Sequence, residues 1–148
     1  MIGGFVDLYP DELLYSGMAR YADWIDYPTK TAICQDLLGA KRVQPILDLP
    51  NRLNYLISVL PPGHQYTADG LIDHHTLLPF YAPFMPADRV ERVRQIMCSD
   101  DRSGLYAIIG LLPGKIPAFL TLRFCPVCAD ENRQHYGEVN REPKGKAE

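Results

Sequence analysis

Two cysteines separated by two residues form the clearest chemical motif in this 148-residue sequence. In the Cys-Pro-Val-Cys segment, the thiolates of Cys125 and Cys128 can reach one metal ion while nearby backbone N–H groups stabilise the sulfurs. A structural zinc site needs four ligands in tetrahedral geometry, and His135 is the third candidate. The spacing therefore predicts a zinc knuckle whose ligand set is incomplete. The alternative is a redox-active pair, which would need a βαβ context that the sequence lacks.

A second chemical feature is a pair of predicted helices joined by residues 26–29. Residues 11–24 and 29–39 show apolar side chains at three- and four-residue spacing, and the pair fits a helix-turn-helix. The second helix would then present its first residues to a major groove, and two basic residues after it would contact phosphate. The predicted DNA-contacting residues are Thr29, Lys30, Thr31 and Gln35 for the groove, and Lys41 and Arg42 for the phosphates. Because the first helix has several acids and helical hairpins are common core elements, core packing or a protein-binding surface is favoured over contact with DNA.

The overall charge weakens the case for a chain that binds nucleic acid alone. The sequence has 15 Lys and Arg against 18 Asp and Glu, a net charge of −3 and a pI of about 5.8. Contacts to phosphate need a positive face, so a local basic stripe stays open but a strongly basic domain does not. No apolar run reaches the ~18 residues of a membrane span, and the first residues lack a secretory-signal pattern. We therefore expect a cytoplasmic protein without a membrane partner.

Helical patterns dominate the chain, so the predicted fold class is mainly α. In the first helix, Asp11 and Glu12 are expected in the first turn, where acids suit the helix dipole, and Gly39 is expected to end the second. Further helices are predicted over residues 49–60, 68–76 after an N-cap at Thr67, 87–97 and 105–112, with a short strand over 118–124. Residues 1–117 would form a helical domain, residues 118–138 a partial zinc-ribbon or zinc-knuckle segment, and residues 139–148 a polar flexible tail.

Three further segments have simple structural interpretations. Residues 77–86 are apolar, aromatic and interrupted by three prolines, which predicts a buried irregular connector. The arginines of residues 87–97, namely Arg89, Arg92 and Arg94, are expected on a solvated helix face. His74 and His75 adjoin Asp73, but neighbouring helix positions point roughly 100° apart, so these side chains are not expected to share a metal.

Three motifs in order resemble the TniQ/TnsD family of transposition target-selection proteins, in its N-terminal part. They are YPDELLYSGMARYADW (residues 9–24), HTLLPFYAPFMP (residues 75–86) and LRFCPVCADENRQHYGE (residues 122–138). The resemblance implies a mobile-element protein of the bacterial cytoplasm that helps recognise target DNA and recruits the AAA+ ATPase regulator of transposition. It also implies a zinc-binding segment, and a route to the target either by direct DNA contact or through an RNA-guided CRISPR complex. Pairing with a second copy stays open.

One departure from the family pattern concerns the zinc segment. In the family, the Cys-x-x-Cys is followed by a further Cys/His pair that completes the site, whereas this chain continues through Tyr136 and Gly137 without such a pair. The resemblance therefore implies zinc as a cofactor, but the family's downstream pair of ligands has no counterpart in this sequence.

Three functional hypotheses can be weighed against these features. The favoured hypothesis is a non-enzymatic adaptor in DNA transposition, which binds a protein partner and target DNA or a CRISPR complex. The alternative is a stand-alone transcriptional regulator with a helix-turn-helix and a zinc finger, which would bind a defined duplex alone. A third hypothesis, a metal-dependent hydrolase using Asp73, His74 and His75, conflicts with the helical geometry of those residues.

Overall fold

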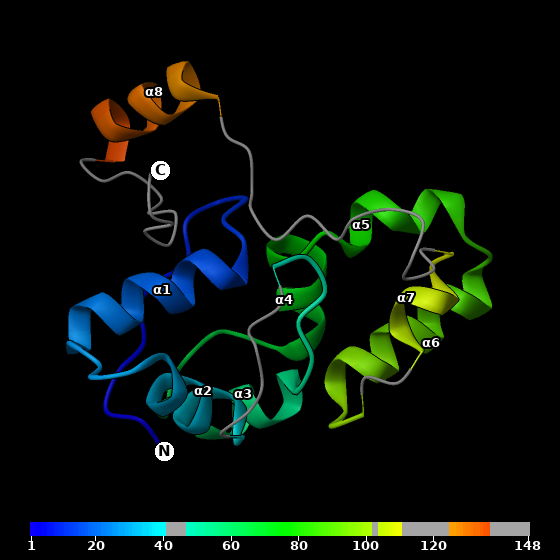
Figure 1. Ribbon diagram of the computed structural model, residues 1–148, viewed down its shortest axis with the longest axis horizontal. Coiled ribbons are helices and arrows are strands. Elements are labelled where there is room, and N and C mark those ends of the chain that lie inside the picture. The colour runs from blue at the N-terminus through cyan, green and yellow to red at the C-terminus, as the bar shows by residue number, and fades with distance from the viewer. Residues whose placement is uncertain (41–46, 102–103, 111–124, 137–148) are drawn as a thin grey trace.

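The computed structural model describes residues 1–40, 47–101, 104–110 and 125–136. Within these ranges the chain is helical and contains no strand, which confirms the mainly α class (Figure 1). The elements are α1 (Leu14–Ile25), α2 (Lys30–Leu38), α3 (Leu53–Val59), α4 (Ala68–His75), α5 (Leu78–Tyr81), the short 3-10 helix η1 (Ala82–Phe84), α6 (Ala87–Cys98), α7 (Leu105–Ile108) and α8 (Pro126–Tyr136). The predicted strand, the domain boundary at 117/118 and the polar tail lie outside the described residues.

Helix α3 lies at the centre of the packing, in contact with α2, α4 and α6. Its side chains Leu53 and Leu56 are completely buried, since residues three and four apart share one face of a helix. Helix α6 contributes Val93 and Met97 to the same core. The other fully buried apolar residues are Leu14, Leu37, Leu49, Leu71, Ile72, Leu78 and Leu105. Helix α8 stands apart from this core in Figure 1.

The start of α1 differs from its prediction. The helix begins at Leu14, and Asp11 and Glu12 precede it rather than occupying its first turn. Asp11 has a left-handed backbone with φ 59°, and Glu12 is buried. The dipole interpretation of these two acids was wrong, because the chain turns before the helix and directs the Glu12 carboxylate to an arginine within the fold.

Helix α2 begins and ends where the sequence predicts. The Thr29 hydroxyl accepts the Ala32 N–H at 3.2 Å, which satisfies one of the free donors at the helix start. Gly39 ends the helix in a left-handed conformation, φ 68°, and donates its N–H to the Gln35 carbonyl. Ile33 and Leu37 are buried between this helix and α3.

The proline-rich connector is more regular and more exposed than predicted. Residues 78–84 form α5 and η1, each of which has a proline in its first two positions, where the missing N–H costs nothing. Leu78 is buried, but Phe80 is 66% exposed and Phe84 is 82% exposed. The expectation of burial was wrong because the helical turn places Phe80 and Phe84, four residues apart, on one outer face.

The arginines of α6 do not all face solvent. Arg89 and Arg92 are exposed, as predicted. Arg94 instead reaches back to α4, where it donates to Asp73 at 2.5 Å and to Asp69 at 2.9 Å. The prediction for Arg94 was wrong, because the contact between α4 and α6 brings two acids within its reach.

Two of the predicted helices are shorter in the structure. Helix α3 begins at Leu53, after Arg52 with φ 63°, and not at residue 49. Helix α7 covers Leu105–Ile108 and has one fully buried residue, Leu105, whereas Ile108 is half-buried. The residues described by the structure include no helix that is long and apolar enough to cross a membrane.

Candidate functional site

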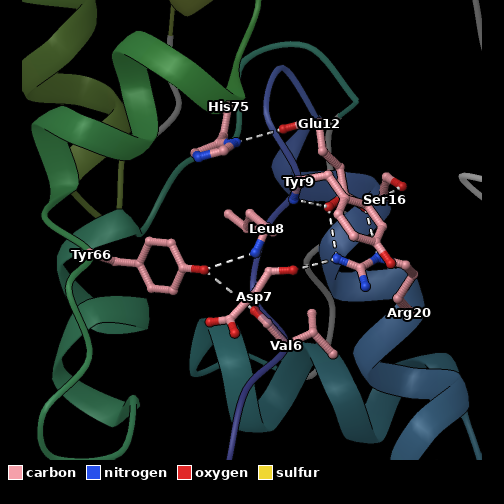
Figure 2. Close-up of polar contacts among 9 residues, drawn as sticks. All are labelled: Val6, Asp7, Leu8, Tyr9, Glu12, Ser16, Arg20, Tyr66 and His75. Atoms are coloured by element: carbon pink, nitrogen blue, oxygen red, sulfur yellow. Dashed lines mark hydrogen bonds and ion pairs between the residues drawn. The ribbon is translucent and has the colours of Figure 1, made fainter. Parts of the chain in front are cut away.

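A buried carboxylate gathers the polar side chains at the start of α1 (Figure 2). Arg20 donates to both oxygens of Glu12, from Nε to Oε1 at 2.9 Å and from its terminal nitrogen to Oε2 at 2.8 Å. The Ser16 hydroxyl donates to Oε1 at 2.8 Å, and the Tyr9 N–H donates to Oε2 at 2.9 Å. The Glu12 side chain is 0% exposed and that of Arg20 is 12% exposed. We call Tyr9, Glu12, Ser16 and Arg20 the Glu12 cluster.

The Glu12 cluster and the residues just before it are joined to α4 and to the segment preceding it by long-range hydrogen bonds of His75 and Tyr66 (Figure 2). The Nδ1 atom of His75, at the end of α4, lies 2.7 Å from the Glu12 carbonyl oxygen. Because a carbonyl can only accept, Nδ1 carries the proton and donates. The Tyr66 hydroxyl accepts the Leu8 N–H at 2.8 Å. The first two family-like motifs therefore meet in space, through Glu12 and His75.

The hydrogen bonds of the Glu12 cluster stabilise the local fold. Four hydrogen bonds saturate the two carboxylate oxygens, so Glu12 has no lone pair directed at a substrate. Arg20 also donates to the Asp7 carbonyl at 2.6 Å and lies 4.1 Å from the centre of the Tyr9 ring. This arrangement holds residues 7–12 against α1 and gives Tyr9, Glu12 and Ser16 of the segment YPDELLYSG a structural role.

Four of the predicted DNA-contacting residues lie at the exposed side of α2. These are Thr29, Lys30, Thr31 and Gln35, whereas Lys41 and Arg42 lie outside the described residues. The Thr29 hydroxyl is already used as the helix cap. Two acids, Asp26 before the helix and Asp36 within it, lie beside the four residues in the sequence. The helix-turn-helix and its contacts with DNA stay predictions.

The two cysteines of the predicted zinc knuckle occupy the start of α8. Cys125 directly precedes the helix and Cys128 lies in its first turn, and both are exposed. The N–H of Cys128, aided by the Cys128 thiol and the Val127 N–H, lowers the pKa of Cys125. The pKa of Cys128 is raised, because its thiol is hydrogen-bonded to Cys125. A stabilised thiolate beside a second sulfur fits half of a tetrahedral zinc site.

The third predicted ligand is less well placed. His135 lies on α8 seven residues after Cys128, which is about two turns or 10 Å along a helix. Histidines that share a zinc on one helix are typically four residues apart. Across the described ranges no group of three or more His, Cys, Asp or Glu side chains gathers, so Cys125, Cys128 and His135 do not complete a site by themselves. Zinc binding and the zinc ribbon stay predictions, and a complete site would need further metal ligands from outside the described residues or from another chain.

The acidic and histidine residues at the end of α4 are held by different neighbours. Asp73 is paired with Arg94, whose hydrogen bond lowers the pKa of this carboxyl. His75 donates to the Glu12 carbonyl, on another element. His74 is exposed, and its ring plane lies 71° from that of His75. Because Asp73 and His75 are held by different elements, these residues do not form a group of metal ligands within the described part of the chain.

The sequence predictions missed Arg20 and Tyr66. Arg20 gave no local signal, because side chains pair along a helix at three- or four-residue spacing, whereas Glu12 precedes α1 and lies eight residues before Arg20. Tyr66 gave no signal either, because its partner Leu8 is 58 residues away and is contacted through the backbone.

Comparison with known proteins agrees with the family resemblance of the three motifs. The model of the TniQ family matches residues 4–144. The chain is also similar to the Transposon Tn7 transposition protein TnsD of Escherichia coli, with 27% identity over 131 residues. That match covers 88% of this chain and 26% of TnsD, so the chain spans about a quarter of the length of this relative. With the family model covering nearly its whole length, the chain belongs to the TniQ family.

Proposed function

We propose that this chain is a non-enzymatic adaptor in DNA transposition, which helps to select the target site and recruits an AAA+ ATPase regulator. The observation that carries the proposal is the TniQ family match over residues 4–144. The similarity to a transposition protein named TnsD points to the same process.

The charge distribution favours a protein partner over tight binding to DNA alone. The net charge is −3, and the exposed start of α2 has Lys30 with acids on both sides in the sequence. Affinity for duplex DNA comes largely from phosphate contacts by basic side chains. Target DNA would therefore be reached with help, either from the AAA+ regulator or from an RNA-guided CRISPR complex.

The described side chains also favour a role without catalysis. The buried acid Glu12 is saturated by hydrogen bonds, and Asp73 is paired with Arg94. A general acid or base needs a free position within hydrogen-bond reach of a substrate. In the part of the chain that the structure describes, these two acids are committed to the fold.

The function can be tested by measuring protein and DNA binding in parallel. The purified chain is expected to co-elute with the AAA+ regulator of its own transposon on size-exclusion chromatography. Fluorescence anisotropy with the candidate target duplex, in about 0.15 M salt, is expected to show weak binding that increases when the regulator is added. Strong duplex binding by the chain alone, with no regulator complex, would instead support the stand-alone transcriptional regulator.

Zinc is part of the proposal, as a structural cofactor of the α8 segment. Cys125 and Cys128 would supply two ligands, and two more would come from outside the described residues or from a partner. When bound, the metal would hold this segment in a fixed conformation. We expect about one zinc per chain by mass spectrometry, lost in the double variant Cys125→Ser/Cys128→Ser. A well-folded chain that contains no zinc would contradict this part of the proposal.

A further inference from the structure

An open cavity of about 560 Å³ lies at the other end of α1 from the Glu12 cluster. The last turn of α1, the second half of α2 and helix α3 contribute to its wall, and the N-terminal residues lie at its edge. Figure 1 shows the N-terminus close to α2 and α3, in agreement with the hydrogen bond from Ile2 N–H to the Val59 carbonyl at 2.8 Å. The polar and aromatic lining residues are Tyr21, Tyr27, Gln35, Asp36 and Tyr55.

The cavity contains an acid that makes no ion pair within the described part of the chain. Its described lining has one carboxylate, that of Asp36, and no Lys, Arg or His side chain; Met1, which carries the N-terminal ammonium, also belongs to the lining, but this group makes no ion pair with Asp36. The Tyr27 hydroxyl donates to Asp36 at 2.8 Å, and Asp36 makes no ion pair with the described residues. None of α1, α2 and α3 has a basic residue in its last turn, where the partial charge of a helix is negative. Arg52 binds the last carbonyl of α2 but does not line the cavity.

Aromatic rings form the walls beside this carboxylate. The rings of Tyr21 and Tyr27 have centroids 5.8 Å apart. The Tyr55 ring lies against the end of α2, where a Cβ atom at Gly39 would approach the ring to 2.8 Å. Gly39 thus allows the ring to cover the helix end. A carboxylate beside aromatic rings is the arrangement that attracts ammonium and guanidinium groups.

The surroundings of the cavity indicate a protein ligand rather than a free cation. Exposed apolar side chains lie at or near its mouth, with Ile25 45% exposed and Met1 85% exposed. Trp24, the neighbour of Ile25, is 63% exposed. Aromatic and apolar groups around a charged side chain are typical of a protein–protein contact.

We propose that this cavity receives a basic side chain, arginine or lysine, from a segment of a partner protein. The Asp36 carboxylate would bind the cation, the Tyr27 and Tyr55 rings would pack against it, and the apolar mouth would contact the neighbouring residues of the partner. This proposal goes beyond the proposed adaptor function. It does not depend on whether the AAA+ regulator or another protein supplies the basic side chain.

Short peptides test the site without any knowledge of the partner. Blocked Gly-Arg-Gly and Gly-Lys-Gly peptides are titrated into the isotope-labelled chain, and amide NMR shifts are followed. The matched control is Gly-citrulline-Gly, which has nearly the shape of the arginine peptide but no charge. Saturable shifts around Gln35, Gly39 and Tyr55 are expected with the cationic peptides and not with citrulline. A stronger response to one of the two would identify the preferred side chain.

Variants of the cavity residues distinguish binding at this site from weak electrostatic attraction of the peptides to the protein surface. Asp36→Asn is expected to weaken binding of the cationic peptide at least about fivefold. Tyr55→Ala removes one aromatic wall of the cavity and should also weaken binding, without changing the charge. Asp88→Asn, which removes an exposed acid from the first turn of α6, should leave binding unchanged.

Two results would overturn the proposal. Equal binding of the citrulline and arginine peptides would remove the role of charge. If the cationic peptides bind the double variant Lys41→Ala/Arg42→Ala but not the unaltered chain, a basic side chain of this chain itself occupies the cavity.

Discussion

The two ends of α1 lie beside acids with opposite environments. At its start, the Glu12 side chain is completely buried and paired with Arg20 of the same helix. At its end, the Asp36 side chain of α2 is exposed beside an open cavity and accepts one hydrogen bond, from Tyr27. The first acid is paired with a cation inside the fold, whereas the second makes no ion pair with any described residue.

This difference separates folding from recognition. A buried ion pair is costly to break, because the remaining charge cannot regain its water. An exposed carboxylate contributes little to stability but is free to bind a partner's charge. We therefore expect changes at Glu12 to act on the free energy of unfolding, and changes at Asp36 to act on binding.

The largest effect is expected at the buried acid. Glu12→Gln keeps the size of the side chain but leaves the Arg20 guanidinium without its counter-charge, so it should lower the free energy of unfolding by about 3 kcal/mol. Urea unfolding followed by circular dichroism measures this loss. Glu131→Gln on the exposed α8 is the matched control. A loss below about 0.5 kcal/mol at Glu12 would show that the cluster does not stabilise the fold.

A smaller effect is expected where the N-terminal segment is attached to the segment preceding α4. Tyr66→Phe removes the hydroxyl that accepts the Leu8 N–H and leaves this donor without its partner. The expected loss is about 1.5 kcal/mol in the same unfolding experiment. Hydrogen exchange of the Leu8 amide should accelerate, and unchanged exchange would contradict the tether.

The Arg94 ion pairs should contribute less, because their acids are partly exposed. Arg94→Gln is expected to cost about 0.5–1 kcal/mol at pH 7. Since Arg94 lowers the folded-state pKa of Asp73, this stability is present above the unfolded pKa of about 4 and is lost as the pH falls through the folded pKa. Unfolding of both proteins at pH 7 and at successively lower pH should show the difference shrinking. Arg133→Gln, which breaks an exposed pair within α8, is the control.

The smallest effect on stability is expected at the open end of α1. Asp36→Asn removes a charge but retains an oxygen that can accept the Tyr27 hydroxyl, so the free energy of unfolding should change by less than about 0.5 kcal/mol. If Asp36→Asn lowered the free energy of unfolding as much as Glu12→Gln does, the proposed difference in role between the two acids would be contradicted.

Local patterns in the sequence were sufficient to predict where several helices begin or end. Thr29 and Gly39 mark the ends of α2, and Thr67 caps α4 by accepting the Gly70 N–H at 3.0 Å. These signals could be read because a capping residue and its helix are adjacent in the chain. The mainly α class followed from the same periodicity.

Features that depend on tertiary contacts could not be predicted in this way. Glu12 looked like a helix-dipole acid because its pairing with Arg20 needs the turn at Asp11. Phe80 and Phe84 looked buried because their composition is apolar, and composition does not specify which face a short helix presents. The cavity of Asp36 and Tyr55 joins residues of different helices, and no motif marks it.

The most direct test of the target-selection proposal is sequencing of transposon insertions in cells with and without this chain. If the chain helps to select the target, its removal should abolish insertions at the preferred site, and insertions that remain should be scattered. The variant Asp88→Asn, remote from both ends of α1 in the sequence, should retain the wild-type distribution. An unchanged distribution of insertions without the chain would contradict the proposed function.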